Sequence, residues 1–341
     1  MNQRKSKIKE EAIMSDQATI QDRMEILFLY ETKDCNPNGD PLDENKPRTD
    51  PETGVATVTD VRIKRTVRDY LFHVKGLEIL VRDTEDDQGY LKDGKGRCDD
   101  FLTAAGVNKE DTIATMVSKV RTTILSQCID TRLFGSTLPV EFGKNKSSIK
   151  LTGPVQFSGF NRSLHRVSPQ LIQGTAGFAS SKNATQKSFR EDHMLPYALI
   201  AAYGVVNEVA ARTTGLSEQD VDLLLEGLWK GTESLISRSK MGHQPLLLAR
   251  IRYRNGRRVG DLAGRLRLIS EKEDTAIRSV EDYAIDATRL LDGLNAMSTD
   301  VSAVEVIQDF RLRFKDGDSV GAFSELVAKR GFSVTSLGRV R

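Results

Sequence analysis

Cysteine, export signals and long apolar runs are scarce or missing in this sequence of 341 residues. The three cysteines, Cys35, Cys98 and Cys128, lie far apart, which excludes a disulfide framework and a Cys-x-x-Cys zinc site. The longest uncharged stretch near the middle, 194–207, is shorter than the ~20 apolar residues that span a bilayer. Residues 1–17 contain no apolar segment that would direct export. We therefore expect a globular protein of the reducing cytoplasm without membrane contact.

Acidic residues are missing from one long stretch and nearly missing from another, although the formal net charge is only +2. Residues 143–190 hold no Asp or Glu, and residues 238–267 hold nine Lys and Arg with the single acid Asp261. The acids are concentrated at 83–100, 208–233 and 271–309. One basic run would indicate only a solvated helix face. Two such runs indicate a cationic surface that binds a polyanion, such as a nucleic acid.

Hydrophobic periodicity and turn residues divide the chain into strands and helices. We expect strands at 24–31, 153–160, 245–253 and 304–310, and helices at 61–75, 113–129, 217–242 and 279–297. The segment 195–206 fits either, and the polar segment 174–193 is typical of a mobile loop or a hairpin. This order predicts an α+β protein with a ferredoxin-like core and large insertions. The RNA-recognition fold has this topology, but its aromatic signature is missing, so base stacking on the sheet is not expected.

The loop at 33–54 contains four prolines and a near match to a calcium-binding loop. Asp34, Asn36, Asn38 and Gly39 fit positions 1, 3, 5 and 6 of an EF-hand. Position 12 is Asn45 instead of the bidentate Glu, and a strand precedes the loop instead of a helix. The sequence therefore argues against calcium.

Two further patterns come close to cofactor or metal sites. Gly89, Gly94 and Lys95 have the spacing of a Walker A loop, but Gly96 stands where a Mg²⁺-binding Ser or Thr is needed. The acids at 83–87 would repel phosphate. No His-Glu-x-x-His pattern occurs among His73, His165, His193 and His243. We therefore expect neither a metal nor a cofactor.

His165 is the histidine closest to basic residues, because it lies between Arg162 and Arg166. An imidazole in this position can shuttle protons during RNA cleavage while the arginines stabilise the phosphorane. More often such a residue stacks on a base or donates a hydrogen bond to phosphate. Both interpretations point to RNA.

Four separated motifs carry a family resemblance. They are NPNGDPLDENKPRTDPETG at 36–54, TDVRIKRTVRDYL at 59–71, GPVQFSGFNRSLHRV at 153–167 and SRSKMGHQPLLLARIRY at 237–253. In this order they resemble the backbone subunit of type I CRISPR Cascade complexes, most closely subtype I-B, within the repeat-associated mysterious protein superfamily. The resemblance runs from about residue 24 to the C-terminal region. Residues 1–23 lie outside it and are expected to form an N-terminal extension.

The resemblance implies a non-catalytic scaffold that polymerises along the spacer of a CRISPR RNA. Residues 24–341 would then form a single RNA-recognition-like palm with a finger-like insertion at 82–112 and a thumb-like insertion at 174–193. Each thumb would displace one nucleotide and leave the other bases free to pair with target DNA in antiviral defence. The implied partners are the CRISPR RNA, further copies of the chain, the target strand through the guide, and the large, capping and RNA-processing subunits.

Side chains in these motifs, together with Phe178 of the thumb-like insertion, are the expected RNA contacts, because a variable spacer must be held through sugar and phosphate. For phosphates we expect Arg48, Lys64, Arg65, Arg162, Arg166, Arg238 and Lys240. For hydrogen bonds to phosphate or 2′-hydroxyl we expect Asn36, Asn38, Ser163, Ser239 and His165, and beside the displaced base Phe178 and Met241.

Simpler roles stay open for several of these residues. Arg65 and Arg68 can be exposed residues of their helix that pair with Asp69, which would contribute only ~0–1 kcal/mol at the surface. Phe178 can pack beneath its own hairpin. Arg250 and Arg252 share one strand face and can meet the acidic side of a neighbouring copy instead of RNA.

Two other functions are alternatives to the scaffold. Type III relatives cleave RNA with an aspartate in the loop after the first strand, where this chain has Asp34, Asp40 and Asp43. This would make the protein a metal-dependent ribonuclease, although the surrounding motif is that of the type I subunits. A calcium-ordered adhesion or interaction module is the other rival.

Overall fold

The apolar segment near the N-terminus forms the central strand of a large sheet. The structure is a computed structural model that describes residues 19–143, 145–179 and 187–340, without the side chains of residues 145, 175–179, 187–190 and 339. Strand β1 (Arg23–Cys35) is buried continuously from Met24 to Thr32. An uninterrupted apolar run, as opposed to an alternating one, is typical of a strand that is covered on both faces. The expected strand at 24–31 is therefore confirmed and extended.

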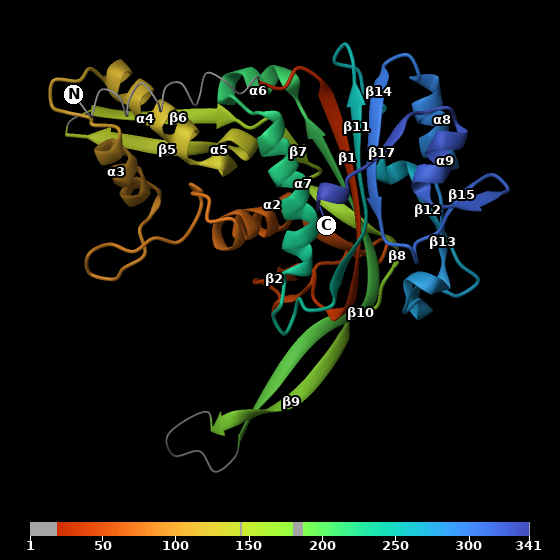
Figure 1. The fold of residues 1–341 in the computed structure, drawn as a ribbon. Coiled ribbons are helices and arrows are strands. Elements are labelled where there is room, and N and C mark those ends of the chain that lie inside the picture. Colours follow the sequence, from red (N-terminus) through yellow and green to blue (C-terminus); the bar gives the residue numbers. More distant parts are fainter. Residues whose placement is uncertain (1–18, 144, 180–186, 341) are drawn as a thin grey trace. The chain divides into compact units, whose positions relative to one another are not determined.

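Two compact units make up the chain (Figure 1). Unit 1 comprises Met1–Arg23, Val67–Gln156 and Val205–Gly227, and unit 2 comprises Met24–Thr66, Phe157–Gly204 and Leu228–Arg341. The architecture is mixed α/β, with sheets and helices in both units.

Unit 2 is built on a nine-stranded sheet of order β17-β14-β11-β1-β10-β8-β4, with β7 and β9 pairing with β10 off this path. The other strands are β4 (Val55–Thr59), β7 (Val155–Phe157), β8 (Phe160–Arg166), β9 (Gln170–Ala179), β10 (Lys187–Val206), β11 (His243–Tyr253), β14 (Val301–Gln308) and β17 (Val334–Ser336). Strand β8 pairs antiparallel with both β10 and β4. The ambiguous segment 195–206 is thus a strand.

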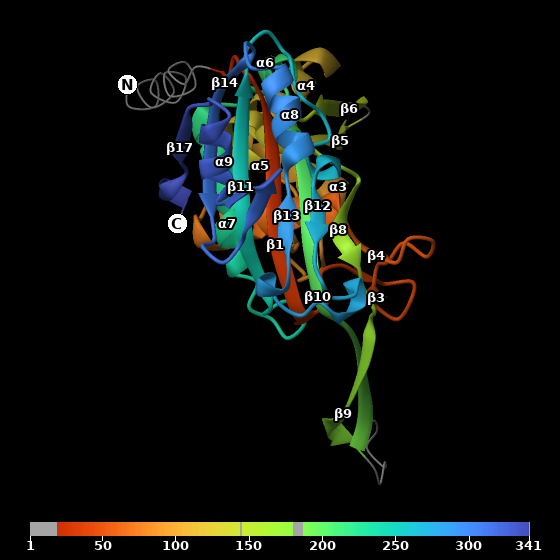
Figure 2. The ribbon, with the colours of Figure 1, turned by 90° about the vertical axis from the view of Figure 1, so that its right-hand side faces the viewer.

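One face of this sheet is covered by the C-terminal part of the chain, as Figure 2 shows. The cover consists of α8 (Thr288–Ala296), α9 (Phe323–Lys329) and a four-stranded sheet of β12 (Arg267–Ile269), β13 (Ala284–Asp286), β15 (Phe314–Asp316) and β16 (Ser319–Gly321). The short 3-10 turn η2 (Ala263–Arg265) precedes β12, η3 (Asp274–Ala276) and η4 (Val280–Asp282) lie between β12 and β13, and η5 (Gly338–Val340) follows β17. Leu290, Phe314 and Phe323 pack against Leu247 and Ile251 of the large sheet, so the main core of unit 2 lies here.

Two helix segments lie beside β1 and β11 within unit 2. They are the first part of α2 (Asp60–Asp69) and the end of α7 (Glu218–Glu233). Ile63 and Leu228 line a small cavity together with Phe28, Tyr30 and His243. The start of α2 is therefore held against the sheet by apolar contacts, which fixes the positions of its basic side chains.

The polar segment 174–193 belongs to a long hairpin of β9 and β10. The two strands pair from Met194 opposite Gln170 to Lys187 opposite Ala179. The hairpin extends away from the sheet of unit 2 in Figures 1 and 2. The expected hairpin is confirmed over the described residues, and residues 180–186 lie outside them.

Unit 1 contains helices and a second hairpin. Its elements include the π-helical turn η1 (Tyr70–Val74), α3 (Gly94–Ala104), α4 (Ile113–Gln127), α5 (Ile129–Phe134), α6 (Glu208–Thr214), β5 (Gly135–Phe142) and β6 (Asn145–Thr152). Cys98 and Cys128 are buried with Phe101, Val120 and Leu138 in its core. The expected excursion at 82–112 includes α3, which packs against β5.

Two helices are shorter than the periodicity predicted. The helix expected at 217–242 ends at Glu233, because the following residues turn back towards the end of β1. The helix expected at 279–297 is confined to Thr288–Ala296. Its first part forms η4 instead, where the carboxylate of Asp282 accepts hydrogen bonds from the backbone of Ser279 and Arg278. Local side-chain capping therefore overrides the helical spacing.

Candidate nucleic-acid interface

Three segments of unit 2 that carry sequence motifs are joined by backbone hydrogen bonds. The loop after β1 contacts the loop 237–242, where Asn36 N donates to Ser239 O at 2.9 Å and Lys33 N donates to Gly242 O at 2.9 Å. A side chain at Gly242 would collide with the carbonyl of Lys33, so only glycine allows this approach. The loop also reaches β8, because Val167 N donates to Gly54 O at 2.9 Å.

Asn36 and Lys240 form the centre of the contact between the two loops. Asn36 is 2% exposed, and its Nδ2 donates to Asn45 O at 2.6 Å. The ammonium of Lys240 donates to the carbonyl of Asn36. Burial, together with the nearby charge of Arg62, lowers the pKa of Lys240 to about 8. Ser239 is half-buried and contributes its carbonyl to the same contact.

Asn38 and Arg48 hold the proline-rich loop on the sheet. The Oδ1 of Asn38 accepts hydrogen bonds at 2.9 Å from both the backbone N and the Oγ1 of Thr59. Arg48 forms an ion pair with Asp40 at 3.1 Å. Its side chain stays 31% exposed, and it lines a cavity of about 490 Å³ together with Arg162.

Strand β8 separates its residues into an outward and an inward set. Phe160, Arg162 and Arg166 are exposed, whereas Ser163 and His165 are buried. This alternation follows from the two-residue period of a strand. The expected phosphate-binding arginines of β8 therefore face outward on the same side of the strand as Phe160.

The inward residues of β8 are used inside the protein. Ser163 Oγ accepts from Ala56 N at 2.9 Å and donates to His165 O at 2.6 Å. His165 is 3% exposed, and its Nε2 accepts from Leu199 N at 3.3 Å. Its Nδ1 then carries the proton and donates to Arg166 O at 2.9 Å. Burial lowers the pKa of His165, so the ring is a neutral structural partner placed away from solvent.

The remaining expected contacts lie on α2, on the loop 237–242 and on the hairpin. Lys64 pairs with Asp60 at 2.8 Å, and Arg65 is half-buried on the same helix. Arg238 pairs with Asp192 of β10 at 2.5 Å and stays 53% exposed. Met241 is 73% exposed. Phe178 belongs to β9, but its side chain lies outside the described residues.

The three loop aspartates of the ribonuclease alternative do not converge. Asp43 pairs with Lys46 at 2.7 Å, Asp40 pairs with Arg48, and Asp34 is exposed at the end of β1. In the part of the chain that the structure describes, no group of three or more His, Cys, Asp or Glu is placed to hold a metal ion. Within the same part, no helix has the length and hydropathy needed to cross a bilayer.

Contact with a neighbouring copy, the role left open for Arg250, does not fit its position. Its side chain is fully buried, with Nε at 2.5 Å and Nη2 at 2.6 Å from the carboxylate of Glu305 on β14. Arg252 pairs with the same carboxylate at 3.1 Å. Burial opposes ionisation of Glu305, but these two arginines outweigh it and lower the pKa of the carboxyl. Part of the second basic block is therefore internal.

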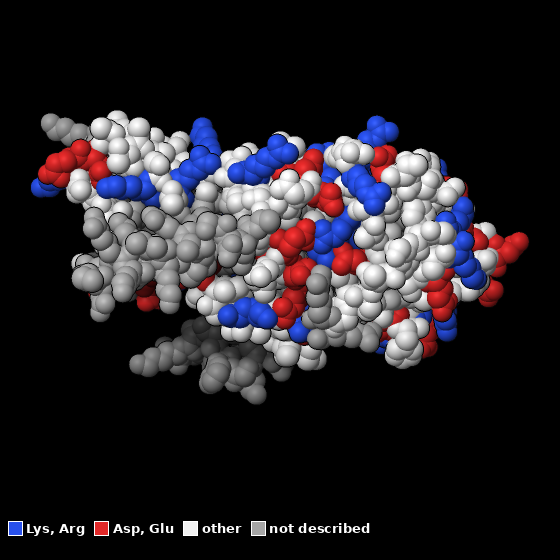
Figure 3. Space-filling view, turned by 45° about the horizontal axis from the view of Figure 1, so that its top comes forward, with Lys and Arg blue, Asp and Glu red and all other residues white. Residues whose placement is uncertain are grey.

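Charges of both signs also mix on the surface. On the face drawn in Figure 3, Lys and Arg lie among Asp and Glu and do not form one continuous basic patch. The basic side chains of this face are therefore scattered among acidic ones.

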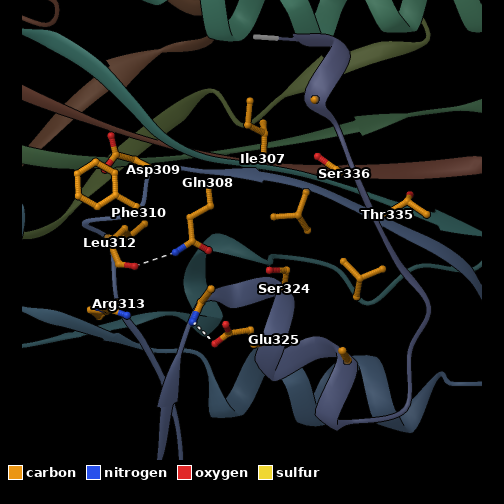
Figure 4. Close-up of a pocket in the computed structure, with 15 residues that line it drawn as sticks. Ile307, Gln308, Asp309, Phe310, Leu312, Arg313, Ser324, Glu325, Thr335 and Ser336 are labelled. Carbon is orange, nitrogen blue, oxygen red and sulfur yellow. Dashed lines mark hydrogen bonds between the residues drawn. The ribbon is translucent and has the colours of Figure 1, made fainter.

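A larger cavity of about 860 Å³ lies between the end of β14, α9 and β17 (Figure 4). Two of its polar side chains are used within the protein, since Gln308 Nε2 donates to Leu312 O at 2.7 Å and Glu325 accepts from Ala322 N at 3.1 Å. None of the expected RNA contacts lines this cavity. The interface at β8 is therefore the better candidate site.

Phe160 is the residue of this interface that the sequence analysis missed. It is 56% exposed, and it lines two cavities that both also include Arg162. The alternation in FNRSLHR contained the signal, because it places Phe160 on the face of the two arginines.

Comparisons with known proteins agree with the sequence resemblance. The family model described as CRISPR-associated protein Cas7 matches residues 22–288. The chain is 33% identical over 317 residues to a protein of Haloferax volcanii named CRISPR-associated protein Cas7, with 88% of this chain and 91% of that protein covered. A chain of a solved CRISPR RNA-guided surveillance complex, described as pre-nicking, is similar in fold with a TM-score of 0.51 at 12% identity, covering 91% of this chain and 99% of that chain.

Proposed function

The chain belongs to the CRISPR-associated Cas7 family, and on this premise we propose that it is the backbone subunit that holds the CRISPR RNA in a Cascade-type surveillance complex. The guide is held through its sugar-phosphate chain, and its bases are left to pair with target DNA. The protein acts in this role as a scaffold and not as a catalyst.

The observation that carries this proposal is the outward set of cations on unit 2. Arg162 and Arg166 point outward from β8, and Arg48 and Arg238 stay partly exposed on the adjoining loop and beside the hairpin. Long, partly exposed basic side chains suit phosphates, which are identical in every sequence. Asn36, Ser163 and His165 support the backbone from which these cations project.

We assign the family's parts to the units as follows. The large sheet of unit 2 is the RNA-recognition-like palm, and the hairpin of β9 and β10 is the thumb, with Arg238 and Met241 beside its base. The segment 82–112 of unit 1 is the finger. Copies of the chain associate along the RNA, and further Cascade subunits complete the complex.

Fluorescence anisotropy with single-stranded RNAs of unrelated sequence and increasing length tests the proposal. We expect sequence-independent binding that becomes cooperative as the RNA accommodates several copies. If each copy engages about five phosphates, log K falls with log salt with a slope near −3.5, at roughly −0.7 per phosphate. Absence of RNA binding at low salt would refute the proposal.

Whether the bound RNA is cleaved distinguishes the ribonuclease alternative from the scaffold. Binding without cleavage in the presence of Mg²⁺ or Mn²⁺ supports the scaffold. Metal-dependent cleavage that is lost in the variants Asp34→Ala, Asp40→Ala and Asp43→Ala would instead establish an enzyme of the same superfamily.

A further inference from the structure

A second cavity borders the outward face of β8 and is lined by two aromatic rings. Its volume is about 580 Å³, and Phe160, Arg162, Tyr203 and Gly264 are among its lining residues. Ligand sites of small molecules have volumes of ~300–1,000 Å³, so there is room for one nucleotide. The cavity lies entirely within unit 2.

The two rings differ in how they are held. The hydroxyl of Tyr203 donates to the buried carboxylate of Glu25. Phe160 has no polar group to anchor it and is 56% exposed. An aromatic side chain that is left in water beside a cation has the composition of a surface on which a nucleobase stacks.

The same buried acid also holds a loop that contributes to the cavity lining. Glu25 is 0% exposed, and its carboxylate accepts from Val259 N at 3.0 Å and from Gly260 N at 2.8 Å. These bonds hold the start of the loop that continues to Gly264 and Leu266 in the cavity lining. Glu25 therefore anchors the loop that supplies part of the cavity lining.

The charges in the cavity decide which part of a nucleotide enters. Asp261 lines it, and its Oδ1 accepts from Gly264 N at 3.1 Å. A carboxylate at this position repels phosphate but not an uncharged base. Arg162 lies at the border with the neighbouring cavity of about 490 Å³, where it can reach the phosphate of the same nucleotide.

We propose that one base of each RNA segment bound by a subunit enters this cavity and stacks on Phe160, while Arg162 contacts the adjoining phosphate. This inference rests on the proposed RNA-binding function and adds a base contact to it. The contact is independent of sequence because every base has a π-face.

The test measures the affinity of several variants for two RNAs. One is a single-stranded RNA short enough for one subunit, and the other has the same length but abasic sugars. We expect Phe160→Ala to bind the base-containing RNA about 5-fold to 150-fold more weakly, the range of one base–aromatic stack, and to bind the abasic RNA like the wild type. Phe160→Trp should retain binding. Arg162→Ala should weaken binding to both RNAs.

Phe310→Ala is the matched control, because this ring is 84% exposed on unit 2 but lies outside the interface. It should bind both RNAs like the wild type. RNA that carries 5-iodouridine, which crosslinks to aromatic side chains, should yield a crosslinked peptide containing Phe160. Thermal unfolding of each variant checks that the fold is kept.

Two results would overturn the inference. One is equal binding of Phe160→Ala and wild type to the base-containing RNA. The other is weaker self-association of Phe160→Ala without RNA and an equal loss of affinity for both RNAs, which would make Phe160 part of a protein contact. Failure of the wild type to bind either RNA would instead refute the proposed function, and this inference with it.

Discussion

Replacement of Lys240 by methionine should separate stability from RNA binding. The ammonium of Lys240 is largely buried and donates to the carbonyl of Asn36. Its pKa falls from 10.5 to about 8, chiefly because burial disfavours the charged form. Since one pKa unit corresponds to about 1.4 kcal/mol, the charged form is penalised in the folded state by about 3 kcal/mol. Methionine removes this penalty at similar volume.

The variant loses one hydrogen bond in exchange. The carbonyl of Asn36 is left without its lysine partner, which costs about 1–3 kcal/mol for a buried group. At neutral pH we therefore expect Lys240→Met to be between equally stable and about 2 kcal/mol more stable than the wild type. Its RNA affinity should nevertheless fall, because the positive charge beside the interface is gone.

The pH dependence gives the sharper result. Lys240 has a lower pKa in the folded chain than in the unfolded chain, so between about pH 8 and 10.5 the unfolded chain binds more protons. Wild-type stability then rises with pH across this window, relative to the variant, by up to about 3 kcal/mol. Urea unfolding of both proteins at several pH values between 7 and about 10 measures this difference.

Neighbouring titratable groups require a control background. The pKa of His243 is lowered to about 4 by burial, so His243 is neutral throughout this window. Burial raises the pKa of the Cys35 thiol, while Lys240 lowers it slightly. The wild type and Lys240→Met should therefore also be compared with Cys35→Ala added to each. Parallel stability curves of the two chains in that background would refute the reasoning, because no proton would then be released by Lys240 on folding.

Three further predictions concern other charged groups. Glu305→Ala removes the carboxylate that accepts from the buried Arg250 and should lower the free energy of unfolding by about 3–5 kcal/mol in urea titrations; a loss below about 1 kcal/mol would contradict the buried pair. Arg162→Ala should reduce the salt slope of RNA binding by about 0.7 at an unchanged melting temperature, and an unchanged slope would remove Arg162 from the interface. Asp130 accepts from Arg68 Nε at 2.8 Å, so Asp130→Asn should cost about 1.5–3 kcal/mol in thermal unfolding, and an unaltered midpoint would argue against this bond.

Local patterns predicted the strands better than the ends of the helices. The run at 24–31 is apolar throughout most of its length, and it forms β1 because a central strand can bury so many consecutive residues on both of its faces. The helix expected at 279–297 had the right spacing over its whole length. Its first part forms the 3-10 turn η4 because Asp282 caps the backbone of Ser279, a contact that apolar periodicity does not encode.

The candidate site was likewise predicted only in part. Sequence motifs identified the segments that meet, but not which side chains face solvent. His165 is buried because Leu199 and Asp274 contact its ring, and both are distant in the sequence. Arg250 is internal because Glu305 lies opposite it on the paired strand. Such pairings depend on strand register, which the order of basic residues alone does not reveal.

A protein that binds RNA of variable sequence needs a rigid protein backbone and side chains that adapt to the RNA. Strand β8 provides both. Ser163 and His165 point inward and fix the strand by hydrogen bonds to Ala56 and Leu199. Arg162 and Arg166 point outward on long side chains that can follow a phosphate chain of any sequence. Substitutions of the inward residues should therefore reduce stability and RNA binding together, whereas substitutions of the outward residues should reduce binding alone. An inward substitution that weakens binding at full stability would break this division and place His165 or Ser163 in contact with the RNA.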